Sequence, residues 1–160
     1  MTIEKALQII AGLCSKKECC SRDVLEKLKR WEFSEEDRQK ILAFLQQHQF
    51  VDDERFARIY AEDKFRFNGW GKQKIAMMLR QKGISSEVIA HALDSIQIQQ
   101  YTDNCLELLK QKVRSLPEEE PYKIKARLIR FALGRGFDYD TVRQCLNRLG
   151  EFPADDEDQT

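Results

Sequence analysis

Basic side chains gather in the middle of this 160-residue chain, where they are interleaved with aromatic rings. From Lys64 to Ser86 the sequence holds six basic residues and no acidic one. Each Lys or Arg that contacts a phosphate displaces counterions, so binding of nucleic acid at such a region weakens steeply with salt. Two arginines just upstream extend the region. The candidate contact residues are therefore Arg55, Arg58, Lys64, Arg66, Lys72, Lys74, Arg80 and Lys82.

Three aromatic residues, Phe65, Phe67 and Trp70, lie among these cations. Aromatic rings beside basic groups can stack on the bases of single-stranded nucleic acid. Apolar residues at helical spacing are more often part of a core. We therefore favour core packing for the three rings and a binding role for the basic side chains.

A second basic zone covers residues 123–148, and the acidic stretch 83–122 separates it from the first. The acidic triplet Glu118–Glu120 in that stretch is interpreted as a linker, with imitation of nucleic acid as the alternative. Segregated charge of this kind gives directional electrostatics in a chain whose formal net charge is zero. A solvated helix face and a second binding surface both remain open for Lys123, Lys125, Arg127, Arg130, Arg135, Arg143 and Arg148.

The acidic run Asp52-Asp53-Glu54 is the one place that resembles a catalytic carboxylate cluster. Adjacent residues at a helix start point in different directions, and capping already explains acidic residues there. No second carboxylate cluster is spaced to complete a two-metal site. Gly69-Trp70-Gly71 also lacks the spacing of a phosphate-binding loop. We therefore expect a non-enzymatic protein without a cofactor.

The five cysteines form no C-x-x-C pair, and neither histidine is spaced near them, so we expect no metal site. Cys14, Cys105 and Cys145 fall in apolar helical patterns and are interpreted as small core residues. Cys19-Cys20 lies where two predicted helices meet, and a reactive pair is the alternative to a structural one there.

Apolar residues at helical spacing predict helices along the whole chain. The stretch after the N-cap Asp52 places Phe56, Ile59, Tyr60, Asp63 and Phe67 on one face, breaks at Gly69–Gly71, and re-enters a helix that ends near Gly83. Other predicted helices span residues 2–16 and 101–115 and follow the caps Ser21, Ser34, Ser85 and Asp138. A further helix is predicted after the break at Pro117–Pro121 and ends near Gly134.

The helices repeat in groups of three. Phe33, Ile84 and Phe137 each precede a cap, and they are 51 and 53 residues apart. Gly83 and Gly136 precede two of these anchors as helix C-caps, whereas the first copy has Glu32. The sequence thus predicts an elongated all-α fold of three tandem three-helix, helix-turn-helix-like repeats. Their predicted boundaries are 1–49, 50–98 and 99–150, followed by an acidic mobile tail over 151–160.

Residues 50–84 hold a set of residues in fixed order. They are Phe50-Val51-Asp52-Asp53, Arg55-Phe56-Ala57-Arg58, Tyr60, Gly69, Gly71, Ile75, Leu79 and Lys82-Gly83-Ile84. This pattern resembles the signature of the RecX family, bacterial regulators of the RecA recombinase. The resemblance implies three tandem three-helix modules and binding to the RecA–DNA filament. It also implies inhibition of ATP hydrolysis, filament extension and strand exchange by RecA.

Composition fits a helix-rich protein with much exposed surface, since 42% of the residues are hydrophobic and 34% are charged. The sequence has no apolar run long enough for a bilayer and no signal-peptide pattern, so we expect a cytoplasmic monomer. The expected partner is the RecA filament, with single- or double-stranded DNA as a further candidate. The alternatives are a general DNA-binding protein and a passive helical adaptor for another partner.

Overall fold

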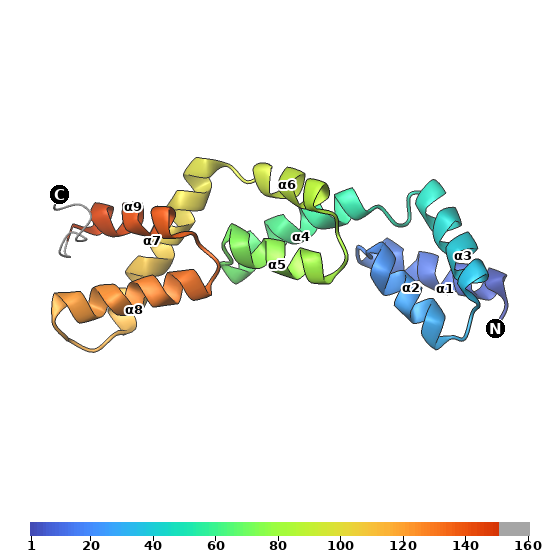
Figure 1. Ribbon diagram of the computed structural model, residues 1–160, viewed down its shortest axis with the longest axis horizontal. Helices are drawn as coiled ribbons and strands as arrows, with labels where there is room; N and C mark the ends of the chain where they lie inside the picture. The colour runs from blue at the N-terminus through green and yellow to red at the C-terminus, as the bar shows by residue number, and fades with distance from the viewer. Residues whose placement is uncertain (151–160) are drawn as a thin grey trace. The chain divides into compact units, whose positions relative to one another are not determined.

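The computed structural model describes residues 1–150, and within that range the chain is helical with no strand (Figure 1). This confirms the predicted all-α fold. The predicted acidic tail, 151–160, lies outside the described residues. The helices are α1 (Ile3–Lys16), α2 (Ser21–Arg30), α3 (Glu35–Gln47), α4 (Asp53–Asn68), α5 (Lys72–Gln81), α6 (Ser86–Asp94), α7 (Ile98–Ser115), α8 (Pro121–Gly134) and α9 (Tyr139–Leu149).

Four of the predicted helix starts are confirmed by side-chain caps. The side-chain oxygens of Ser34, Asp52, Ser85 and Asp138 each accept the backbone N–H group three residues further on, at distances of 3.0 to 3.3 Å. These bonds satisfy first-turn donors that have no partner inside their own helix. None of the helices in residues 1–150 is long and apolar enough to cross a bilayer.

The predicted cap at Ser21 is wrong by one residue, because Cys20 holds the N-cap position of α2 and its side chain makes no capping bond. Ser21 is the first helical residue, and its N–H donates to Oδ1 of Asp53 at 2.8 Å. Asp53 begins α4, so a side chain from another helix caps α2. Sequence spacing within one helix carries no sign of such a cap. The helix predicted over 101–115 also begins earlier, at Ile98.

The three predicted repeat anchors occupy the same structural position. In each, the anchor N–H donates to the carbonyl five residues upstream, which is the long bond of a Schellman helix ending. These bonds join Phe33 to Leu28 at 3.2 Å, Ile84 to Leu79 at 3.1 Å and Phe137 to Ala132 at 3.1 Å. The same helix ending thus recurs once in each of the three predicted repeats.

The residue before each anchor adopts a left-handed backbone, including the one that is not glycine. The φ angles are +65° at Glu32, +78° at Gly83 and +98° at Gly136. A residue with a Cβ atom is strained in this region by about 1–2 kcal/mol. The first repeat therefore has the same helix ending as the others in spite of its glutamate.

By contact density the chain forms two compact units. Unit 1 contains residues 1–60 and 78–92, and the described part of unit 2 contains 61–77 and 93–150. Both α4 and α5 contribute to each unit, so this division differs from the predicted repeat boundaries, which remain a prediction. The core of unit 1 includes Ala6, Ile10, Val24, Leu28, Ile41 and Leu45, and that of unit 2 includes Phe65, Ile75, Tyr101, Leu109, Leu128 and Phe137.

The buried face of α4 differs from the predicted one. Ala57, Ala61 and Phe65 are nearly inaccessible, whereas Ile59 is 37% exposed and Phe67 is 79% exposed. The prediction gave most weight to large apolar side chains. Alanines at a spacing of four residues instead let neighbouring backbones approach closely. Ile59 and Phe67 are therefore accessible at the surface.

Candidate functional site

Trp70 is the centre of the basic region in unit 2. The ammonium nitrogens of Lys64 and Lys74 lie 5.0 and 4.5 Å from the centroid of the half-buried indole ring. Both distances are within cation–π range, where the negative face of the ring attracts a cation. The ring therefore gathers two positive charges at one place, one from α4 and one from α5.

The turn that carries Trp70 is fixed by backbone contacts with the segment after α8. The N–H groups of Gly71 and Gln73 donate to the carbonyl oxygens of Arg135 and Gly136, at 2.7 and 3.0 Å. A Cβ atom on Gly71 would lie 2.3 Å from the carbonyl carbon of Gly136, so only glycine fits there. We call this contact of residues 71–74 with 135–137 the second junction.

Tyr101 completes the second junction from α7. Its hydroxyl oxygen accepts the N–H of Lys72 at 3.1 Å, and the Lys72 ammonium lies 5.1 Å from its ring. Burial raises the pKa of Tyr101 well above its usual range, so the phenol stays protonated. No carboxylate of residues 1–150 forms an ion pair with Lys72 or Lys74. Their charges thus remain uncompensated by a direct ion pair within the described chain.

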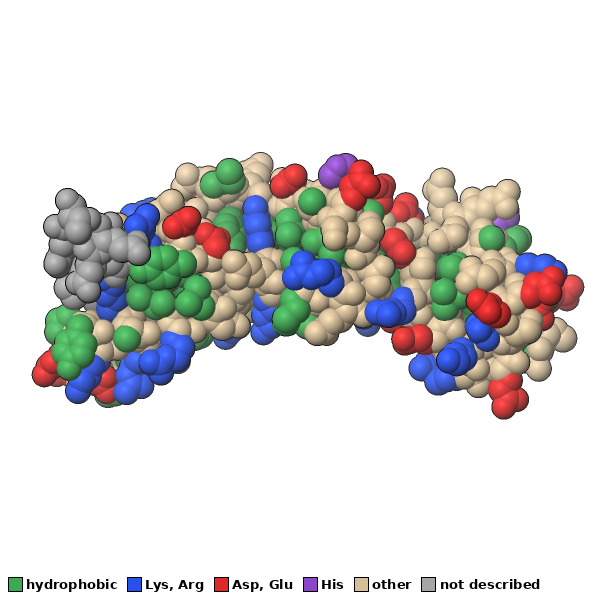
Figure 2. Space-filling model, in the orientation of Figure 1, with side chains coloured by type: hydrophobic (Ala, Val, Ile, Leu, Met, Phe, Trp, Pro, Cys, Tyr) green, Lys and Arg blue, Asp and Glu red, His purple; other side chains and the backbone are tan. Residues whose placement is uncertain are grey.

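The second basic zone does not form one surface. Figure 2 shows basic side chains gathered over α8, where Lys123, Arg127 and Arg130 line a groove with Glu119. Arg135 instead belongs with the Trp70 region, because its Nη1 donates to the carbonyl of Asn68 at 3.0 Å. The others separate: Lys125 is half-buried on α8, and on α9 Arg143 lies 4.0 Å from Asp140 and Arg148 lies 3.5 Å from Asp103.

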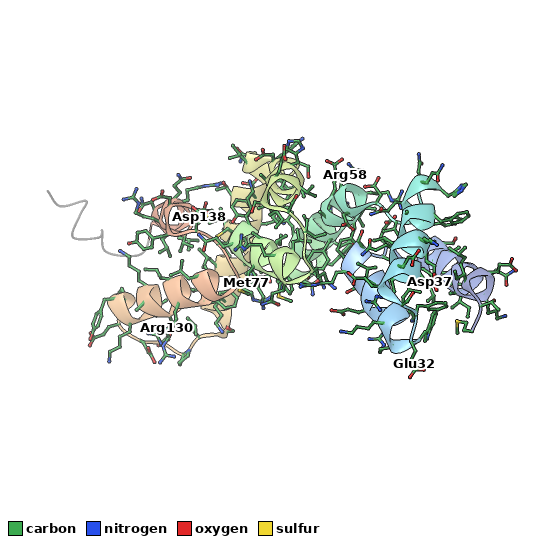
Figure 3. All side chains as sticks on the ribbon, turned by 45° about the vertical axis from the view of Figure 1, so that its right-hand side comes forward. Glu32, Asp37, Arg58, Met77, Arg130 and Asp138 are labelled. Atoms are coloured by element: carbon green, nitrogen blue, oxygen red, sulfur yellow. The ribbon has the colours of Figure 1, made fainter. Side chains whose placement is uncertain are left out.

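Three of the predicted contact residues are exposed outside the Trp70 cluster. Arg58, labelled in Figure 3, is exposed on the part of α4 in unit 1 and lines a pocket with Glu54 and His91. Arg80 is exposed near the end of α5. Arg66 lies 3.7 Å from Glu62 one helical turn away, and both side chains are largely solvated. All three can therefore be reached by a partner.

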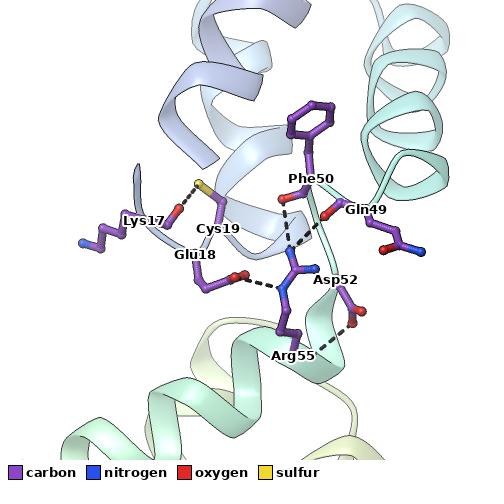
Figure 4. A network of polar contacts seen from close by, with 7 residues as sticks. All are labelled: Lys17, Glu18, Cys19, Gln49, Phe50, Asp52 and Arg55. Carbon is purple, nitrogen blue, oxygen red and sulfur yellow. Dashed lines mark hydrogen bonds and ion pairs between the residues drawn. The ribbon is translucent and has the colours of Figure 1, made fainter. Parts of the chain in front are cut away.

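Arg55 has an intramolecular role that its sequence position did not reveal. Its Nε donates to Glu18 at 2.8 Å, and its Nη2 donates to the carbonyls of Gln49 and Phe50 at 3.0 and 3.5 Å (Figure 4). The guanidinium is 28% exposed. It thus joins the α1–α2 loop to the segment before α4, and its charge is already compensated. We propose a structural role for Arg55 in place of the predicted partner contact.

Lys82 is engaged in the same way. Its ammonium lies 3.3 Å from Oδ2 of Asp23 and 5.8 Å from the ring of Phe56. Beside it, Nη1 of Arg22 donates to the carbonyl of Gln81. We call this contact of residues 20–23 with 81–83, together with the Ser21–Asp53 bond, the first junction. We therefore propose a structural role for Lys82 as well.

The three aromatic residues of the basic region have different surroundings. Phe65 is buried against Tyr101, with ring centroids 5.9 Å apart, which agrees with the predicted core role. Phe67 is exposed, so core packing is the wrong interpretation for that ring. Trp70 is intermediate. Two rings are thus accessible beside the lysines.

Three of the thiols, those of Cys14, Cys20 and Cys105, have environments that favour the protonated form. Burial raises the pKa of Cys14 to about 12 and that of Cys20 to about 11. Cys105 and Cys145 are both fully buried, as predicted, and a hydrogen bond between their side chains raises the pKa of Cys105 and lowers that of Cys145. Within residues 1–150 no group of three or more His, Cys, Asp or Glu side chains is placed to hold a metal ion.

Two contacts of the site were not predicted from the sequence. One joins the Tyr101 hydroxyl to the Lys72 N–H, and the other joins Arg135 to the carbonyl of Asn68. Tyr101 lies in a different predicted repeat, and nothing in its local pattern indicates a hydroxyl that caps α5. Arg135 had a usable signal. It directly precedes Gly136, just as Lys82 precedes Gly83, so the repeat register places both at equivalent positions.

Two family models match the chain, one for the second three-helix domain of RecX over residues 52–93 and one for the third over 99–146. Together they match more than half of the chain. The chain belongs to the RecX family. A regulatory protein RecX of Chlorobium phaeobacteroides is 31% identical over 146 residues, which cover 91% of this chain and 94% of that protein.

Other RecX relatives are longer. A regulatory protein RecX of Clostridium botulinum is 33% identical over 133 residues, which cover 82% of this chain and 62% of the relative. Two crystal structures show the same fold. RecX from Lactobacillus salivarius has a TM-score of 0.85 at 18% identity, covering 92% of this chain and 96% of that one. A second regulatory protein RecX has a TM-score of 0.83 at 22% identity, covering 91% and 73%.

Proposed function

We propose that this protein is a non-enzymatic regulator that binds the RecA–DNA filament and inhibits ATP hydrolysis, filament extension and strand exchange by RecA. Membership of the RecX family supports regulation of RecA. Tandem small modules suit a repeating partner, because each bound module raises the effective concentration of the next. We further propose that it acts in the cytoplasm as a monomer.

The observation that carries the proposal is the cationic cluster around Trp70. Lys64 and Lys74 lie on the indole ring, Lys72 is close by in sequence and space, and Arg135 lies at the same turn. The DNA of a RecA filament offers phosphates, which attract such a cluster. The proposed contact set is Lys64, Arg66, Lys72, Lys74 and Arg135, with Arg58 and Arg80 as outer contacts.

The test is RecA ATPase activity on single-stranded DNA, titrated with this protein. The informative variant is Lys64→Gln with Lys74→Gln, which keeps the aliphatic stems near Trp70 and removes two charges. We expect about tenfold weaker inhibition at low salt, since two charge-assisted contacts are lost. Lys110→Gln with Arg114→Gln removes two exposed charges from α7 and is the matched control. Equal inhibition by both variants would remove the Trp70 cluster from the interface.

A second candidate function is general DNA binding. Exposed Phe67 and half-buried Trp70 among lysines resemble the stacking platforms of single-strand binding proteins. Titration of bare single- and double-stranded DNA separates the two functions. Tight binding that added RecA does not change favours general DNA binding. If lysate pull-downs recover another protein and no RecA, the chain is instead an adaptor for that protein.

A further inference from the structure

Residues 20–23, 71–74 and 124–127 are equivalent in the repeat register. The first two stretches begin α2 and α5, whereas 124–127 lie one turn inside α8, which begins at Pro121. In two of the three copies this stretch is occupied. At the first junction it contacts residues 81–83 at the end of α5, and at the second junction it contacts 135–137 at the end of α8. Each of these faces thus receives the C-terminal end of a helix.

The two occupied faces share one chemistry although they use different groups. Arg22 donates its guanidinium to the Gln81 carbonyl, whereas Gly71 and Gln73 donate backbone N–H groups to carbonyls beyond α8. In both cases the donors meet the terminal carbonyls of a helix. These carbonyls carry partial negative charge, because they lack partners within their own helix.

The third copy of this stretch, on α8, borders an open groove. Ala126 and Arg127 of the stretch line the groove together with Glu119, Tyr122, Lys123 and Arg130. The volume of the groove is about 260 Å³, and the Tyr122 side chain that lines it is 57% exposed. Arg127 is held by Glu119 through two hydrogen bonds of 3.0 and 3.1 Å. No carboxylate of residues 1–150 pairs with Lys123 or with Arg130, which is labelled in Figure 3. Two positive charges and an aromatic ring therefore face solvent where the other copies hold a helix end.

We propose that this α8 groove, lined by Tyr122, Lys123, Ala126, Arg127 and Arg130, docks the C-terminal end of an acidic helix of a partner protein. Helix-end carbonyls and carboxylates near them complement Lys123 and Arg130 in charge. A second copy of this chain would present the end of α2, whose last turn carries Lys27, Lys29 and Arg30, and like charges oppose that pairing. The inference rests on the proposed function, in which the partner is RecA.

The test places a photo-crosslinking residue in the groove, as Tyr122→p-benzoylphenylalanine, in the full chain bound to RecA on single-stranded DNA. Lys110→p-benzoylphenylalanine, at an exposed site of α7, is the matched control. We expect a crosslink to RecA from position 122 that is at least about tenfold stronger than from position 110, since crosslinking requires direct contact. Crosslinks to DNA or to a second copy of this chain would overturn the inference.

Charge reversal gives an independent measurement. Lys123→Glu with Arg130→Glu should weaken binding to the filament by about tenfold at low salt, whereas Lys110→Glu with Arg114→Glu should change it much less. If filament binding persists unchanged and position 122 yields no crosslink to RecA, the groove is not the docking site and the proposed function stands. If the unaltered protein does not bind the filament, the proposed function fails and this inference fails with it.

Discussion

The first and second junctions join equivalent helix ends by different means. The first uses side chains, with the Asp23–Lys82 ion pair, the Arg22 guanidinium on a carbonyl and the Asp53 carboxylate on the Ser21 N–H. The second uses mainly backbone groups, and Gly71 lies against the backbone of Gly136. Cys20, fully buried, occupies in the first junction the position of Gly71 in the second.

This difference separates two kinds of rigidity. Backbone hydrogen bonds between closely packed helix ends are insensitive to salt but tolerate no added atom. Ion pairs on partly exposed side chains tolerate substitution, but salt screens them. The Trp70 cluster lies beside the rigid second junction, so its lysines start from a fixed backbone. A binding site held this way loses little conformational entropy on binding.

Gly71→Ala should have the largest effect, because it breaks the second junction at its closest point. The new Cβ would lie 2.3 Å from the Gly136 carbonyl carbon and 2.4 Å from the Phe137 nitrogen, and neither backbone atom can move aside easily. We expect a loss of more than about 3 kcal/mol in the free energy of unfolding, typical of severe overpacking. Urea denaturation followed by circular dichroism measures it.

Gly12→Ala is the matched control within helix α1. Nothing lies within 4 Å of the Cβ position there, so the change should stabilise the protein by about 0.5–1 kcal/mol through helix propensity alone. A small effect of Gly71→Ala, similar in size to that of Gly12→Ala, would mean that the second junction is not closely packed in solution.

Arg55→Ala tests the side-chain network next to the first junction and should have the second largest effect. The substitution leaves the Glu18 carboxylate without its cation, although Oε2 of Glu18 is already buried without a hydrogen bond in the described chain. We expect a loss of about 2–3 kcal/mol, since breaking a partly buried pair costs more than a surface pair. Arg58→Ala, on the same helix and exposed, should change stability by less than about 0.5 kcal/mol.

A double-mutant cycle with Glu18→Ala isolates the ion pair. If the two substitutions are additive, the pair contributes nothing and the loss comes from the carbonyls of Gln49 and Phe50 alone. The coupling free energy between Arg55 and Glu18 should also shrink in high salt, because salt screens ion pairs. The backbone hydrogen bonds of the second junction should show no such dependence on salt.

Much of the fold could be predicted because its signals are local. The anchors Phe33, Ile84 and Phe137 mark a helix ending that depends on residues within six positions of each other. Caps at Ser34 and Asp138 are local in the same sense. Periodicity and capping therefore locate helices and repeats without knowledge of tertiary contacts.

The candidate site was harder to predict, because charge pairing depends on residues far apart in the chain. Arg55 and Lys82 match the basic pattern as well as Lys74 does, yet their partners are Glu18 and Asp23 from α2 and the loop before it. The prediction of which face of α4 is buried was wrong for a related reason. Alanines carry a weak hydrophobic signal, and their burial is decided by which neighbour packs closely on them.

Raising the pH should weaken the first junction through Cys20, a titratable group where the second junction has Gly71. Burial raises the pKa of Cys20 from 9.0 to about 11, so folding favours the protonated thiol. This contribution is complete below the unfolded pKa and is lost as the pH rises towards the folded one. Between about pH 8 and pH 10.5 we expect a loss of about 2 kcal/mol under reducing conditions. Urea titrations across this range measure it, and Cys20→Ala should show a correspondingly smaller drop.

Glu32→Gly should have the smallest effect and the opposite sign. Glu32 has φ at +65°, the position that Gly83 and Gly136 hold in the later repeats. Because glycine is unstrained there, the substitution should raise the free energy of unfolding by about 1 kcal/mol. Glu32→Ala keeps the Cβ atom and should give almost none of this gain.

Gly83→Ala is the mirror experiment. It should lower the free energy of unfolding by a similar amount through backbone strain alone, because its Cβ would meet only Arg22 at ordinary contact distance. If Glu32→Gly gives no gain while Gly83→Ala destabilises, the left-handed ending of α2 is not maintained in solution. The first repeat would then differ from the other two at its helix ending.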